Sequence, residues 1–97
     1  MTSFDVHDFE KRAFALKREG KFVEAAKLFQ AIVDHIPNWE DGGGAFNLAF
    51  CLEETGDFDG AARAYELALS CDPMNEIFLG NYRSLKERIR QGNCSSR

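Results

Sequence analysis

The sequence predicts an all-α fold, an α-solenoid of two helix-turn-helix repeats closed by a fifth, capping helix. Apolar residues recur every three or four positions, and no long stretch alternates apolar and polar residues as a strand would. Each apolar stretch ends at glycine or proline, which are stop signals for helices. The chain also repeats itself after 36 residues, because EGKFVEAAKLFQAIVDHIP aligns with TGDFDGAARAYELALSCDP.

The first repeat covers about residues 5–37 and contains two predicted helices. Gly20 ends the first helix, and Pro37 follows the second. The apolar face of the first helix comprises Val6, Phe9, Ala13 and Leu16, and that of the second comprises Phe22, Ala25, Ala26, Phe29, Ile32 and Val33.

The second repeat covers about residues 38–73 and contains the third and fourth predicted helices. Gly56 ends the third helix, Asp57 is placed to cap the fourth, and Pro73 follows it. The apolar face of the third helix comprises Leu48, Ala49 and Leu52, and that of the fourth comprises Phe58, Ala61, Ala62, Tyr65, Ala68 and Leu69.

The fifth predicted helix covers about residues 76–90 and has Asn75 as its N-cap. One face is apolar and the rest is charged, as is typical of the terminal helix that shields a repeat array from water. Residues 1–90 are therefore predicted to form a single domain, followed by a flexible polar tail over residues 91–97. The apolar face of this helix comprises Phe78, Tyr82, Leu85 and Ile89.

Three consecutive glycines, residues 42–44, lie between the two repeats. They do not form a phosphate-binding loop, because no Lys-Ser/Thr pair follows them and no strand precedes them. One interpretation is a lengthened turn, with the third helix starting near Gly44. The other is a longer helix that Asn38 caps and that runs through the glycines; Asp41 at its third position favours this second interpretation.

The charge pattern argues against a nucleic-acid surface. The net charge is −4, and residues 32–80 contain one basic and ten acidic residues, which would repel phosphates. No window is apolar enough for a membrane span, and the early residues MTSFDVHDFEKR lack a signal-peptide pattern. We therefore expect a cytoplasmic protein that binds neither nucleic acid nor membrane.

Cysteine and histidine usage predicts no catalytic, metal or cofactor site. The three cysteines are widely spaced, the two histidines stand in no ligand spacing, and no nucleophile has a plausible partner base. Cys51 and Cys71 are expected to be small buried residues, and Cys94 to be a free thiol in the tail. We therefore expect a protein that is not an enzyme and needs no cofactor.

Two sets of landmarks resemble the tetratricopeptide repeat family, whose pattern is W-x2-L-G-x2-Y, then A-x3-F, then P. The resemblance covers about residues 6–75, and it departs from the pattern at Arg12, where the family prefers leucine. The landmarks of the first unit are Phe9, Arg12, Ala13, Leu16, Ala25, Phe29 and Pro37, and those of the second are Ala45, Leu48, Ala49, Leu52, Ala61, Tyr65 and Pro73.

The resemblance implies a non-catalytic module that binds a peptide or helix of a partner protein in a concave groove. The first helix of each unit lines such a groove in this family. The residues that this alignment places in the groove are Phe14, Lys17 and Arg18 from the first unit and Phe46, Asn47, Phe50 and Glu54 from the second. Glu10 and Phe14 stand where a carboxylate-binding member would carry lysine and asparagine, so this chemistry is not expected.

Phe14, Phe46 and Phe50 leave three interpretations open. They form an aromatic strip for an apolar peptide or helix, since exposed apolar patches mark contact sites. Alternatively, they pack into the core. In the third interpretation a second copy of the chain covers the strip, and the acidic middle and basic C-terminal helix are complementary in such a homodimer.

Overall fold

The computed structural model describes residues 4–92, which contain five α-helices, one 3₁₀ turn and no strand. The all-α prediction is therefore confirmed. Residues 93–97, with Cys94 and most of the predicted tail, lie outside the described residues. The elements are α1 (Val6–Arg18), α2 (Phe22–His35), η1 (Trp39–Gly42), α3 (Gly43–Thr55), α4 (Phe58–Cys71) and α5 (Glu76–Arg90).

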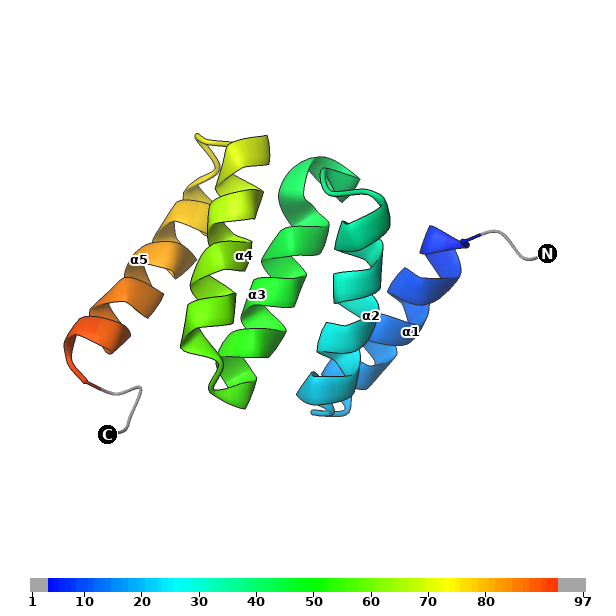
Figure 1. The fold of residues 1–97 in the computed structure, drawn as a ribbon, viewed down its shortest axis with the longest axis horizontal. Coiled ribbons are helices and arrows are strands. Elements are labelled where there is room, and N and C mark those ends of the chain that lie inside the picture. The colour runs from blue at the N-terminus through cyan, green and yellow to red at the C-terminus, as the bar shows by residue number, and fades with distance from the viewer. Residues whose placement is uncertain (1–3, 93–97) are drawn as a thin grey trace.

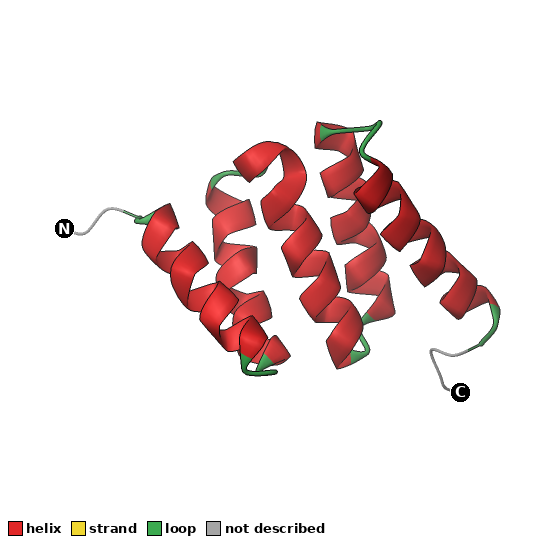
Figure 2. Ribbon diagram, turned by 180° about the vertical axis from the view of Figure 1, so that it is seen from behind, coloured by secondary structure: helices red, strands yellow, loops and turns green. Residues whose placement is uncertain are grey.

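The helices stand in two layers. Figure 1 and Figure 2 view the molecule from opposite sides: α2 and α4 face the reader in the first, and α1, α3 and α5 in the second. Each helix packs on the next one along the chain, and α1 and α5 lie at opposite ends of an elongated molecule of 47 × 29 × 20 Å. This is the arrangement expected of a short α-solenoid.

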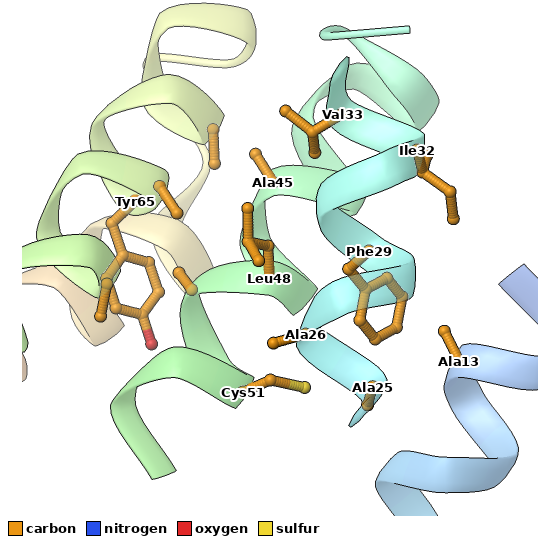
Figure 3. Packing of buried hydrophobic residues seen from close by; sticks show 14 of the residues in the cluster. Ala13, Ala25, Ala26, Phe29, Ile32, Val33, Ala45, Leu48, Cys51 and Tyr65 are labelled. Carbon is orange, nitrogen blue, oxygen red and sulfur yellow. The ribbon is translucent and has the colours of Figure 1, made fainter. Parts of the chain in front are cut away.

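Alanines form the contacts between the helices. Half of the sixteen buried core residues are alanine, and Ala13, Ala25, Ala49 and Ala61 are all 0% exposed. A methyl group lets two helix backbones come close together, whereas a larger side chain would hold them apart. Figure 3 shows Ala13 and Ala25 on facing sides of α1 and α2, with Phe29 filling the space above them.

Side-chain caps fix the start of three helices. Asp5 caps α1 by accepting a hydrogen bond from the Asp8 backbone N–H at 3.2 Å. The Asp57 carboxylate accepts a hydrogen bond from the Gly60 backbone N–H at 2.9 Å, at the start of α4. The side chain of Asn75 accepts bonds from the backbone N–H groups of Ile77 at 2.9 Å and Phe78 at 3.1 Å, at the start of α5. Both predicted caps are confirmed, and each satisfies N–H groups that have no partner within the helix.

The turn between the repeats corrects one prediction. Asn38 makes no capping side-chain bond, Glu40 and Asp41 have φ angles of 52° and 54°, and α3 begins only at Gly43. The interpretation of a long helix from Asn38 through the glycines is therefore wrong. The structure agrees instead with a lengthened turn, and α3 starts at Gly43, one residue before the predicted start.

Gly42 explains why the helix cannot start earlier. Its φ is +100°, and a Cβ atom there would lie 2.7 Å from the backbone oxygen of Ala68 and 3.0 Å from the ring of Phe78. The turn therefore touches the backbone of α4 and must use a left-handed conformation that favours glycine. Glu40 and Asp41 adopt the same left-handed region without being glycine, which stores strain in the turn.

Glu53 holds the capping helix against the second repeat. Tyr65 is fully buried, and its hydroxyl donates to Glu53 at 3.0 Å, while Arg88 of α5 forms a salt bridge with the same carboxylate. Glu53 lies within α3 and is half-buried, so its carboxylate is within reach of both neighbouring helices. Side chains of α4 and α5 thus both contact one carboxylate of α3.

The two cysteines in the described part of the chain differ in burial. Cys51 is 0% exposed and belongs to the core, as predicted. Cys71 is only half-buried, because it is the last residue of α4 and its sulfur faces the backbone oxygen of Pro37 at 3.9 Å. The prediction of a buried Cys71 is therefore wrong.

Two glycine-to-alanine substitutions are expected to change stability in opposite directions. Gly42→Ala should lower the free energy of unfolding by at least about 2 kcal/mol, because it adds left-handed strain to a clash with α4. Gly80→Ala, an exposed site within α5 with no atom near the new methyl group, should raise it by about 0.5 to 1 kcal/mol. Urea unfolding of both variants measures the two values, and a neutral Gly42→Ala would contradict the close contact.

Candidate functional site

Four of the predicted site residues meet where α1 and α3 lie side by side. The ammonium of Lys17 donates to the side-chain oxygen of Asn47 at 3.0 Å. It also lies over the rings of Phe14 and Phe50, at 5.4 Å and 4.9 Å from their centroids. We call these four residues the Lys17 cluster and the exposed surface of α1 and α3 the odd-helix face.

Asn47 is oriented by its own helix. Its side-chain N–H donates to the Gly43 backbone oxygen at 3.0 Å, one turn earlier in α3. The carbonyl oxygen of the same amide therefore faces Lys17, which can only donate. The Lys17 ammonium has two further N–H groups, and no group within residues 4–92 accepts a hydrogen bond from them.

The Lys17 cluster is a cation held between two aromatic faces. Each cation–π contact contributes about 0.5 to 1 kcal/mol at a partly exposed site. The three contacts also hold the long side chain in place, so less conformational entropy remains to be lost when a partner binds. Lys17 therefore presents an ordered positive charge with apolar rings on both sides.

The three phenylalanines neither form one continuous strip nor disappear into the core. Each is half-buried and packs on at least one other aromatic ring. Phe14 packs on Phe29 at 5.4 Å, and Phe50 packs on Phe22 at 6.0 Å. Each ring thus contributes one side to packing and leaves part of its surface accessible.

Phe46 lies apart from the Lys17 cluster. It stacks on Phe78 of α5 with centroids 5.1 Å apart and approaches Tyr65 of α4 at 6.0 Å. The structure therefore places Phe46 at the contact between the second repeat and the capping helix. Arg18 and Glu54 are exposed near the carboxyl ends of α1 and α3, at the same end of the odd-helix face.

A second cluster at the start of α1 was not predicted from the sequence. The indole N–H of Trp39, in η1, donates to the Glu10 carboxylate at 3.2 Å, and His7 contacts the indole edge at 5.4 Å. Glu40, in the same turn as Trp39, lies beside Glu10 of α1. The signal in the sequence was Trp39, the single tryptophan, which lies before the glycines. Apolar periodicity does not assign Trp39 to the helix before it or to the helix after it.

Glu40 is mostly exposed, yet its carboxylate loses hydration in the turn. This loss of hydration raises the pKa of Glu40 above its ordinary value of 4.5; repulsion by Glu10 and a hydrogen bond between the two carboxyl groups add to the rise. The nearby His7 opposes the shift in pKa. Ionisation of Glu40 therefore costs more free energy in the folded turn than in the unfolded chain.

The buried titratable groups, Cys51 and Tyr65, are held in their neutral forms. Burial raises the pKa of the Cys51 thiol to about 11, so the thiol stays protonated at neutral pH. Burial, with the neighbouring Glu53 carboxylate, also raises the pKa of Tyr65 above its usual range. Among the described residues, no three His, Cys, Asp or Glu side chains come together as metal ligands would.

Comparison with known families decides the assignment. A family description, tetratricopeptide repeat, matches residues 16–89, which is more than half of the chain. The chain belongs to the tetratricopeptide repeat family. A search of curated proteins found no match. The resemblance read from the two sets of landmarks is therefore confirmed.

Tetratricopeptide repeats generally mediate protein–protein interactions and are in general non-catalytic. In this tetratricopeptide repeat domain, no helix within residues 4–92 is long and apolar enough to cross a bilayer. The Lys17 cluster uses one helix from each repeat, so its geometry depends on how the two repeats stack. The surfaces that the stacked repeats create are therefore the candidate sites for the function of the domain.

A double-mutant cycle tests the Lys17 cluster. Lys17→Met keeps the apolar stem and removes the charge, and Phe50→Leu removes the ring; we expect a coupling of about 0.5 to 1 kcal/mol in urea unfolding. Lys17→Met combined with Phe9→Leu, a ring that Arg12 and not Lys17 contacts, should be additive within about 0.5 kcal/mol. Equal coupling in both cycles would contradict a specific contact.

Glu40→Gln tests the strained turn through its pH dependence. The raised pKa means that protonated Glu40 stabilises the fold below the ordinary glutamate pKa, and that this stabilisation is lost as the pH rises through the higher folded value. The permanently neutral variant should therefore be more stable than the wild type at about pH 7 and nearly equal to it at about pH 3.5. Urea unfolding at both pH values measures the difference, and an equal difference at both would refute the assigned cause.

Proposed function

We propose that this domain is a non-catalytic binding module that holds a peptide or helix of a partner protein across its odd-helix face. The observation that carries the proposal is the Lys17 cluster, in which side chains from both repeats converge on one ordered ammonium group. A site shared between repeats uses the surface that stacking creates, which neither repeat has alone.

The chemistry of the Lys17 cluster indicates what the bound segment carries. The free N–H groups of Lys17 suit an acidic side chain, and the exposed parts of Phe14 and Phe50 suit an apolar side chain next to it. Arg18 and Glu54 at the end of the face would set the direction of the segment. Phe46 and Asn47 extend the contact along α3 toward α5.

The Lys17 cluster differs from a site for a free carboxylate. Only one lysine is present, its Asn47 partner is already bonded to it, and Glu10, at the predicted position of a second lysine, is bonded to Trp39. We therefore propose an internal segment with an acidic and an apolar residue as the ligand, and not a chain terminus. The cytoplasmic location inferred from the sequence stays a prediction.

Affinity capture with matched variants tests this proposal. Wild-type protein immobilised on resin should retain partner proteins that Lys17→Glu and Phe14→Ala/Phe50→Ala fail to retain. Arg83→Glu, an exposed substitution on α5 away from the Lys17 cluster, should retain them as the wild type does. Circular dichroism confirms folding of each variant. Unchanged retention by Lys17→Glu and by the double variant would exclude the odd-helix face.

Self-association is the second candidate function. Met74 and Ile77, at the start of α5, are 81% and 64% exposed, so an apolar patch faces solvent at one end of the solenoid. A second copy stacked on this end would cover it, and the basic α5 could then pair with the acidic middle of that copy.

Sedimentation equilibrium across a hundredfold concentration range, about 1 to 100 μM, distinguishes these two functions. A monomer at all concentrations leaves the odd-helix face free for partners and excludes the homodimer. A dimer that Met74→Ser/Ile77→Ser dissociates supports stacking through the end patch. A dimer that Lys17→Glu dissociates instead assigns the odd-helix face to a second copy.

A further inference from the structure

The core of the protein reaches the surface between α2 and α4. Both helices pack on α3, and two neighbouring hollows of about 350 Å³ and 270 Å³ lie between them. Leu48 and Leu52 of α3 line both hollows, so we treat the two as one groove, the α2–α4 groove. Figure 3 shows Leu48 on α3 in the space between α2 and α4.

The residues lining this groove are the least covered part of the core. Ala26, Val33, Leu48 and Ala64 are 7%, 6%, 4% and 5% exposed, whereas every other core residue except Phe78 is at most 1% exposed. All four line the α2–α4 groove. Val23, at one edge of the groove, is 58% exposed. The groove is thus an apolar surface that no described segment of the chain covers.

Two basic side chains flank the groove on opposite walls. Lys27 projects from α2 and Arg63 from α4, and both are exposed. Within residues 4–92, neither has a salt bridge or a side-chain hydrogen bond. Arg63 is also the only basic residue among residues 32–80, which contain ten acidic ones. Acidic side chains of a partner are therefore attracted to this groove.

The geometry of the groove favours a helix as its occupant. Its walls and floor are helical, so their backbone N–H and C=O groups are already paired. An extended peptide would place its own backbone groups on an apolar floor with no sheet edge to pair them, which is unfavourable. A helix pairs these groups internally and offers only side chains. The small wall residues Ala26, Gly60 and Ala64 let such a helix approach closely.

We propose that the α2–α4 groove binds an amphipathic helix of a partner protein whose apolar stripe is flanked by acidic side chains. The apolar stripe would cover Val23, Leu48 and Leu52, and acidic residues on its two sides would pair with Lys27 and Arg63. The wall formed by α2 has 14 residues. A matching helix would have about four turns and be about 20 Å long.

A second copy of this chain fits the groove less well. The helix with the least cover is α5, at the end of the solenoid. Its exposed charges are mainly basic, with Arg83, Lys86, Arg88 and Arg90 against Glu76 and Glu87. Lys27 and Arg63 would repel it.

At one end of the groove the Asp57 carboxylate caps α4, so its charge is partly satisfied by the Gly60 N–H group. The partner helix is therefore expected to keep its acidic residues away from that end.

Selection from a displayed library of helical peptides tests the proposal. The peptides, each about 15 residues long, carry a fixed leucine stripe and varied flanking positions, and they are selected on the wild-type protein. We expect Asp and Glu to be enriched on both flanks. The affinity of a selected peptide should fall at least about tenfold in Lys27→Glu/Arg63→Glu, because two favourable charge pairs become repulsive.

Matched variants separate this groove from the odd-helix face. Arg83→Glu/Lys86→Glu makes the same change in net charge on α5 and should leave affinity within about twofold of the wild type. Phe14→Ala/Phe50→Ala, which alters the Lys17 cluster, should also leave it unchanged. The two proposals therefore fail independently of each other.

Four results would overturn the proposal. The first is a selection that enriches no helix, and the second is one that enriches lysine and arginine on the flanks. The third is binding that survives Lys27→Glu/Arg63→Glu but is lost in Phe14→Ala/Phe50→Ala, which would move the site to the odd-helix face. The last is self-association that Val23→Glu abolishes, which would make a second copy the occupant.

Discussion

Close contact between helices at alanine side chains determines the rest of this structure. Because Ala13 meets α2 and Ala61 meets α3 with no exposed surface, the helix axes are too close for large side chains between them. Aromatic residues therefore lie beside these contacts, as Phe14 does against Phe29. The same constraint that compacts the core thus brings half-buried rings to the surface, where they can contact a partner.

The turn between the repeats sets how the second repeat stacks on the first. Gly42 brings the chain against the Ala68 backbone, and two strained residues, Glu40 and Asp41, complete the reversal. The turn also places Trp39 against Glu10 of α1, which ties the two repeats together at their amino-terminal end. At the other end Lys17 and Asn47 make a second tie. The relative position of α1 and α3, and hence the Lys17 cluster, depends on both.

The two layers of the solenoid present different chemistry. The odd-helix face offers one ordered cation between aromatic rings, whereas the α2–α4 groove offers an apolar floor between two unpaired basic residues. Both would attract acidic segments, and the helical walls of the α2–α4 groove favour a helix there. The two proposed sites lie on opposite layers, so their partners would not compete for one surface (Figure 1 and Figure 2).

The sequence by itself determined the helical segments, the caps at Asp57 and Asn75 and the resemblance to the family, because periodic apolar residues and capping residues act locally. It also placed Lys17, Asn47, Phe14 and Phe50 on the first helices of their repeats. Only the tertiary structure decided that these four meet, that Phe46 joins the capping helix, and that the glycines form a strained turn against α4. It also showed the uncovered groove between α2 and α4. These features depend on distances between residues far apart in the chain, and apolar periodicity carries no information about such distances.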